Sequence, residues 1–155
     1  MGAFSFKSSG KTQEQRIIET LVKSPIPIGI KTPLRISDTE GLLDVHYVLA
    51  DQVNDNLRNL LLTNWGERVG FYDFGANLRE LTTEISSQDD FDTRAIERIK
   101  SAVGRWMPYI DLEDFESSTN NSNNKNTGII DITVTYNIPS LNVRQKKLVI
   151  TLYVI

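Results

Sequence analysis

The chain has 155 residues, of which 39% are hydrophobic and 24% charged, so it is long enough for one domain with its own hydrophobic core. A formal net charge of −3 gives no electrostatic basis for binding nucleic acid or an anionic membrane. The lack of cysteine excludes disulfides and thiolate metal sites, and the single histidine, His46, leaves little material for a zinc site. We therefore expect no cofactor, no metal and no membrane partner, and a protein made in a reducing compartment.

The N-terminal part of the chain is predicted to form an arm over residues 1–31. It begins with small polar residues, continues with a capping box and a short amphipathic helix, and is interrupted at Pro25 and Pro27. The extended segment 28–36 contains a further proline, which indicates an edge strand or an arm. Residues 32–155 are predicted to form a single domain.

A long amphipathic helix is predicted over residues 44–62. Asn64 or Gly66 is suited to a left-handed cap at its end. The spacings of three and four between apolar residues build one buried face, made of Val45, Leu49, Val53, Leu57, Leu60 and Leu61.

A glycine-rich loop follows this helix and is predicted to be an ordered structural element. Its aromatic residues are expected to pack on the long helix, and Arg68 and Asp73 are close enough in sequence to pair across the turn. The predicted structural residues of this loop are Gly66, Glu67, Arg68, Asp73, Phe74 and Gly75.

Two further helices are predicted, a short one over residues 77–84 and a longer one with Asp92 as its N-cap. Pro108 closes the longer helix. The side chains that this helix should direct inward are those of Ala95, Ile96, Ile99, Val103 and Trp106.

The C-terminal third is predicted to be β-structure, with strands over residues 109–116, 129–138 and 147–155. A polar loop over 117–128 and a turn over 139–142 connect them. The middle strand alternates between apolar and polar residues, and the last strand is apolar on both faces after a basic start. Because helices precede strands, the fold class is α+β: two main helices packed on a small antiparallel C-terminal sheet, with an N-terminal arm and short helix.

Catalytic chemistry finds little support in the residues. His46 is predicted to be a surface or boundary histidine, because no carboxylate near it in sequence would orient it. Glu80 and Asp89 have the spacing of the carboxylate pair in phage-type lysozymes, but Ala95 stands where that pattern has a threonine. Both acidic residues are expected to be helix-surface charges.

The stretch over residues 60–81, LLLTNWGERVGFYDFGANLREL, resembles the baseplate wedge family of contractile tails. This family includes the sheath initiator of T4-like phages, the smaller wedge subunit of Mu- and P2-like phages and the equivalent subunit of type VI secretion systems. The resemblance continues through a helix with Ile96 and Ile99 and through residues 105–111, and it covers the chain from about Pro33 onward.

The resemblance implies two contact sites for partner proteins. The family commonly has Glu-Pro-Arg-Ile where this chain has Met-Pro-Tyr-Ile, so an apolar contact would replace a charged one at the wedge interface, which comprises Trp106, Met107, Pro108 and Tyr109. The initiator also offers an acceptor sheet to strands of the sheath. The predicted sheath-contact strand comprises Leu148, Ile150, Leu152 and Val154.

The resemblance implies a structural, non-enzymatic subunit of the virion tail baseplate, assembled in the host cytoplasm, that joins the wedge and templates the first sheath ring. Its expected partners are other wedge proteins, the tail sheath protein, and tube or hub proteins. One alternative is a tail-associated enzyme that cleaves peptidoglycan, with Glu80 and Asp89 or Glu67 and Asp73 as its acidic pair. Another is a peptide-binding adaptor that uses an exposed strand.

Overall fold

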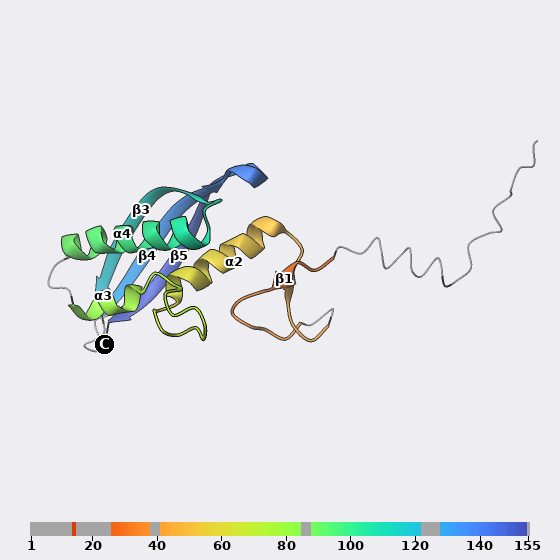
Figure 1. Cartoon of the computed structure of the whole chain (residues 1–155), viewed down its shortest axis with the longest axis horizontal. Coiled ribbons are helices and arrows are strands. Elements are labelled where there is room, and N and C mark those ends of the chain that lie inside the picture. The colour runs from red at the N-terminus through yellow and green to blue at the C-terminus, as the bar shows by residue number, and fades with distance from the viewer. Residues whose placement is uncertain (1–13, 15–25, 38–40, 85–87, 122–127, 155) are drawn as a thin grey trace, which may run out of the picture.

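In the described part of the chain, three α-helices cover one face of a three-stranded antiparallel sheet, which confirms the α+β class (Figure 1). The structure is a computed structural model, and it describes residues 14, 26–37, 41–84, 88–121 and 128–154. Apart from Glu14, the capping box and short helix predicted near the N-terminus lie outside these residues. The division of the chain at residue 31 stays a prediction.

The long helix is α2, which spans Leu49–Leu62 and starts five residues later than predicted. Val45 and His46 form a short strand instead, so the apolar spacing that seemed to begin at Val45 is not helical there. The predicted left-handed cap is also wrong, because the C-cap is Thr63 with extended backbone, and its N–H donates to Asn59 O.

The other two helices are α3, Leu78–Glu84, and α4, Gln88–Trp106. α3 begins one residue after its predicted start, and α4 begins four residues before Asp92, which is therefore inside the helix rather than its N-cap. The inward face of α4 is as predicted, with Ala95, Ile99 and Val103 buried and Ile96 and Trp106 half-buried.

The sheet consists of β3, Asp111–Asn121, β4, Gly128–Ile138, and β5, Val143–Val154, in the order β3-β4-β5. Residues 117–121 were predicted to be loop but pair with β4, because strand pairing uses the backbone and tolerates polar side chains. β4 and β5 are joined by a 3₁₀ turn, Pro139–Leu141, where a turn was predicted.

The core lies between the sheet and the helices. The alternation predicted for the middle strand is confirmed, since every second side chain of β4 is buried, namely those of Ile130, Ile132, Val134, Tyr136 and Ile138. Their partners across the interface include Leu57, Leu60 and Leu61 of α2, which are fully buried. Such a continuous cluster is the main source of the stability of a domain of this size.

Both edge strands of the sheet have one register shift against β4. That of β3 lies between Leu112 and Asp114, and that of β5 lies opposite Tyr136 and Ile138, beyond which β5 pairs with β4 continuously from Lys146 to Val154. β5 was predicted to be apolar on both faces. It has a buried face, with Leu148, Ile150 and Leu152, and an exposed face. Among the described strands, β5 lies at an edge of the sheet and not at its centre.

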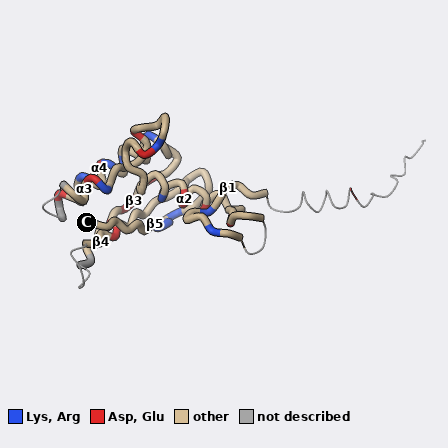
Figure 2. The backbone as a smooth tube through the Cα atoms, turned by 90° about the horizontal axis from the view of Figure 1, so that it is seen from below, with Lys and Arg blue, Asp and Glu red and all other residues tan. Residues whose placement is uncertain are grey.

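A two-stranded ribbon lies beyond the N-terminal end of α2 (Figure 1). It pairs β1, Gly29–Ile30, with β2, Val45–His46. A Cβ on Gly29 would stand 1.9 Å from Oε1 of Gln52, so the glycine side of β1 lies against α2. Side chains alternate along a strand, so Ile28 and Ile30 face away from α2. Figure 2 shows few charges on this ribbon, and its exposed apolar residues include Ile26, Ile28, Ile30, Leu34, Ile36 and Leu42.

Candidate functional site

The loop between α2 and α3 is closed by hydrogen bonds between its two ends. The N–H of Gly66 donates to Tyr72 O over 2.7 Å, and the indole N–H of Trp65 donates to Gly75 O over 3.0 Å. Gly66 and Gly75 have φ values of 85° and 114°, in the left-handed region that favours glycine. The glycines of this loop therefore hold turns that other residues adopt only with strain.

Glu67 holds the start of this loop. Its carboxylate accepts the backbone N–H and the side-chain amide of Asn64, each over 2.8 Å. These two hydrogen bonds, the backbone one first, lower the pKa of Glu67, and the charge of Arg79 adds to them. Glu67 is therefore ionised at neutral pH and acts as a brace for the turn.

The aromatic residues of the loop pack on α4, not on α2 as predicted. The Phe71 and Phe74 rings meet Trp106 edge to face, with centroids 5.8 and 5.2 Å away. Phe71 is nevertheless 56% exposed, and Trp65 and Tyr72 are exposed as well. The expected burial is thus wrong for Trp65, Phe71 and Tyr72, whereas Phe74 is half-buried and packs against the core. The exposed rings form an aromatic surface beside the end of α4.

The predicted pair of Arg68 and Asp73 does not form, because each side chain has another partner. The Arg68 guanidinium lies 3.7 Å from the Phe74 ring centroid, and Asp73 forms an ion pair with Arg105 of α4. Both contacts stabilise the loop, one by a cation–π interaction and the other by tying it to α4.

The predicted wedge interface lies directly after α4. Met107 is only 5% exposed and belongs to the core, so its side chain offers no surface to a partner. Pro108 is exposed, Tyr109 is 44% exposed, and Trp106 is half-buried under the loop. A hollow of about 230 Å³ separates this segment from α2, lined by Asn56, Asn59, Arg68, Phe74, Trp106, Met107 and Tyr109.

The predicted sheath-contact strand is β5. Three of the four named side chains, those of Leu148, Ile150 and Leu152, are buried against the helices. Val154 pairs with Gly128 at the end of the ladder, and its side chain lies outside the description. The accessible parts of β5 are its backbone edge and the outward side chains, which include Val149, Thr151 and Tyr153.

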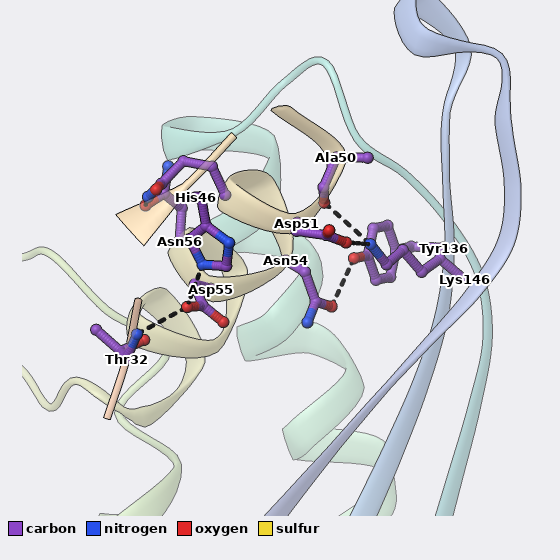
Figure 3. A network of polar contacts seen from close by, with 10 residues as sticks. Thr32, His46, Ala50, Asp51, Asn54, Asp55, Asn56, Tyr136 and Lys146 are labelled. Atoms are coloured by element: carbon purple, nitrogen blue, oxygen red, sulfur yellow. Dashed lines mark hydrogen bonds and ion pairs between the residues drawn. The ribbon is translucent and has the colours of Figure 1, made fainter. Parts of the chain in front are cut away.

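A buried carboxylate, which sequence reasoning missed, joins the ribbon to α2 (Figure 3). Asp55 Oδ2 lies 2.8 Å from His46 Nε2 and accepts the Thr32 N–H over 2.8 Å. Burial raises the pKa of Asp55, but the hydrogen bonds from His46 and Thr32 outweigh it and hold the pKa below its ordinary value. Because an ionised carboxylate only accepts, Nε2 of His46 carries the proton.

A second group of polar contacts joins α2 to the sheet (Figure 3). The Tyr136 hydroxyl of β4 donates to Asn54 Oδ1 over 2.7 Å, and Lys146 Nζ of β5 lies 2.8 Å from Asp51 Oδ1. Burial, with smaller effects from Asp51 and Asp55, raises the pKa of Tyr136 to about 12. These contacts fix the position of α2 on the sheet.

Three of the four acidic residues of the enzyme alternative, Glu67, Asp73 and Glu80, have structural partners. Glu80 accepts hydrogen bonds from the Asn77 side-chain amide and from Arg98 Nη1, the latter over 3.0 Å. The side chain of Asp89 lies outside the description. Within the described ranges, no cluster of three or more His, Cys, Asp or Glu residues could hold a metal ion, and no helix is long and apolar enough to cross a membrane.

Comparison with known proteins identifies a family. The family model described as baseplate wedge protein gp25 matches residues 48–142. A chain in the cryo-EM structure of the anti-feeding prophage baseplate aligns with a TM-score of 0.57 at 20% identity, over 70% of this chain and 82% of that one.

Two further solved structures align less well. A Geobacter sulfurreducens protein named as a candidate tail lysozyme has a TM-score of 0.48 at 21% identity, over 68% of this chain and 89% of that one. A chain of the post-contraction pyocin R2 baseplate has a TM-score of 0.47 at 17% identity, over 68% and 97% of the two chains. No curated protein matches.

Proposed function

Because this chain belongs to the baseplate wedge protein gp25 family, we propose that it joins the wedge of a contractile tail and offers the tail sheath its first acceptor sheet. Family membership makes it a structural component of a tail baseplate that assembles with other baseplate proteins. The sheath-templating role is the finer part of the proposal, and the unpaired edge of β5 is the observation that carries it.

The open edge of β5 is suited to strand addition. Among the described strands, β5 pairs with β4 alone, so every second residue directs its N–H and C=O away from the sheet. Residues 148–153 read Leu-Val-Ile-Thr-Leu-Tyr and contain no charge that would repel a partner strand. An incoming strand would satisfy these backbone groups and extend the sheet by β-augmentation.

The opposite edge supports the same assignment, because β3 carries a feature that discourages pairing. It is a row of carboxylates on the strand, those of Asp111, Glu113, Asp114 and Glu116. Strand addition is therefore expected at β5 rather than at β3.

Replacing Thr151 by proline tests the acceptor role. Thr151→Pro is expected to abolish sheath polymerisation on assembled baseplates, because proline removes an N–H and interferes with strand pairing. Thr151→Val is the matched control, since it keeps the backbone donor and nearly the same volume. Circular dichroism must show a native fold for each variant, and normal sheath growth from a folded Thr151→Pro variant would overturn the proposal.

The wedge contact is proposed at the end of α4, at Trp106, Pro108 and Tyr109. This segment corresponds to the family's docking motif, and its aromatic surface suits the centre of a protein interface. The neighbouring rings of Phe71 and Phe74 extend the same surface. Met107 does not face the proposed partner, because its side chain is buried in the core and anchors the segment there.

We also propose that the protein is not an enzyme. A glycosidase needs a carboxylic acid with a raised pKa across a sugar-binding cleft from a second carboxylate. The pKa of Glu67 is lowered instead, and Asp73 is engaged with Arg105. Glu80 is held by Asn77 and Arg98, so none of these described carboxylates has the environment of a general acid. A cell-wall zymogram distinguishes the two functions directly.

A further inference from the structure

A hollow of about 470 Å³ lies at the C-terminal end of β5, between this strand, α2 and α3. Three consecutive residues of β5 line it, namely Thr151, Leu152 and Tyr153. Leu152 is buried and points toward the helices, whereas Thr151 and Tyr153 are exposed on the other face. Consecutive residues of a strand point to opposite faces of the sheet. A hollow that all three of these residues line must therefore run along the edge of the strand. The hollow is therefore continuous with the unpaired edge of β5.

The remaining walls of this edge hollow combine apolar and charged groups. Leu61 and Leu62 of α2 line it, and Leu62 is 44% exposed although it ends the helix that packs beneath the sheet. Arg79 of α3 and Glu67 are the charged residues of the lining. Glu67 accepts two hydrogen bonds from Asn64, and the charge of Arg79 also acts on its carboxylate, but the described carboxylates form no direct ion pair with the Arg79 guanidinium.

We propose that the edge hollow sets the register of the incoming sheath strand, an inference that rests on the proposed sheath-acceptor function. An extended segment paired with β5 places one apolar side chain against Leu62 and a carboxylate beside Arg79. The apolar contact supplies affinity by burying exposed surface of both partners. The charge pair selects one alignment, since a register slip of one residue turns every side chain to the opposite face.

The test measures binding of the purified sheath protein to full-length variants of this chain. Leu62→Glu places a carboxylate in the hollow and is expected to weaken binding by about tenfold or more. Val69→Glu is the matched control, because Val69 is exposed on a loop and does not line the hollow. Arg79→Glu is expected to weaken binding severalfold at low salt and less at high salt, and Arg79→Lys to restore most of it.

The outcomes separate this inference from the function on which it rests. Failure of the unaltered chain to bind sheath protein would overturn both. Normal binding by the unaltered chain and by Leu62→Glu, to within twofold, would overturn the edge hollow alone. A hollow filled by a second copy of this chain would also overturn it, and would show as a dimer of the purified protein that Leu62→Glu dissociates. All variants are compared by circular dichroism, so a loss of binding is assigned only to folded protein.

Discussion

At the scale of single residues, Gly75 is the tightest point of the loop that presents the aromatic surface. Its backbone has φ 114°, and a Cβ there would stand 2.1 Å from the carbonyl oxygen of Thr63. The neighbouring N–H of Ala76 donates to Leu60 O, and that of Asn77 donates to Thr63 O. At Gly75 the chain thus returns so close to the end of α2 that no side chain would fit there.

Gly75→Ala is expected to destabilise the protein by roughly 2–4 kcal/mol, because strain at positive φ adds to a steric clash with backbone. Gly70→Ala is the matched control. Gly70 also has positive φ, 85°, but a Cβ there would meet no atom within 4 Å, so only the conformational part, about 1–2 kcal/mol, should be lost. Urea unfolding of both variants measures the difference, and equal losses would contradict the steric explanation.

Asp55 is expected to make stability depend on pH in the acid range. Its pKa is lower in the folded protein than in the unfolded chain, so its contribution is present above the ordinary value of 3.8 and is lost as the pH falls through the folded pKa. Asp55→Asn should cost about 1–3 kcal/mol near neutral pH, where the charged hydrogen-bond acceptor is lost.

The measurement for Asp55 is thermal unfolding of the unaltered chain and of Asp55→Asn over a series of pH values. The difference in stability between the two should narrow as the pH falls from 3.8 through the lower pKa of the folded state, since the carboxyl is protonated first in the unfolded chain and then in the folded one. A difference that persists unchanged into strong acid would contradict the assigned role of the ionised carboxylate.

At the scale of elements, the spacing of apolar residues predicted the parts of the fold that depend on neighbours close in sequence. β4 was predicted to within a residue of its start because it has a partner on both sides and alternates strictly. The start of α2 was wrong because Val45 continues the helical spacing, while its actual partner is Ile30, 15 positions earlier. The partners of the loop aromatics and of His46 also lie far away in sequence or on another element. The spacing of residues along the chain does not predict such contacts.

Both contact sites stay predictions from the family resemblance. For the segment 106–109, the burial of Met107 depends on how α4 meets the core, which residue spacing alone does not determine. For the predicted sheath-contact strand, the helices cover one face of β5, so Leu148, Ile150 and Leu152 are buried. The edge hollow involves three separate elements and had no signal in the sequence.

The end of α4 gives a prediction at this scale. Tyr109→Asp is expected to weaken co-purification with the wedge partner about tenfold or more while leaving the fold intact, because Tyr109 is exposed at the proposed interface. Met107→Asp is unsuitable for this test, since a charge in the core would unfold the domain. Tyr153→Asp is the matched control, because it places the same charge at an exposed tyrosine of β5. Unchanged co-purification of Tyr109→Asp would reject the wedge site.

At the scale of the whole molecule, the surfaces proposed for other proteins lie on separate elements around one hydrophobic core. The aromatic surface stands at the end of α4, and the open edge of the sheet belongs to β5. The ribbon adds an apolar face beyond α2, directed away from the helix to which Asp55 ties it. Helices α3 and α4 carry interspersed acidic and basic residues, as Figure 2 shows, and have the character of a solvated surface.

The carboxylates of β3 leave β5 as the edge of the described sheet that is suited to strand addition. A sheet open on both sides could take up a strand at one edge and pass the pairing on through the other, so that copies would join into an unlimited ribbon. With β3 unfavourable for pairing, the proposed strand addition at β5 would let each copy bind a single strand and transmit none. In a ring of such copies, the number of strands captured would equal the number of copies, and the proposed sheath growth would have one direction in which to proceed.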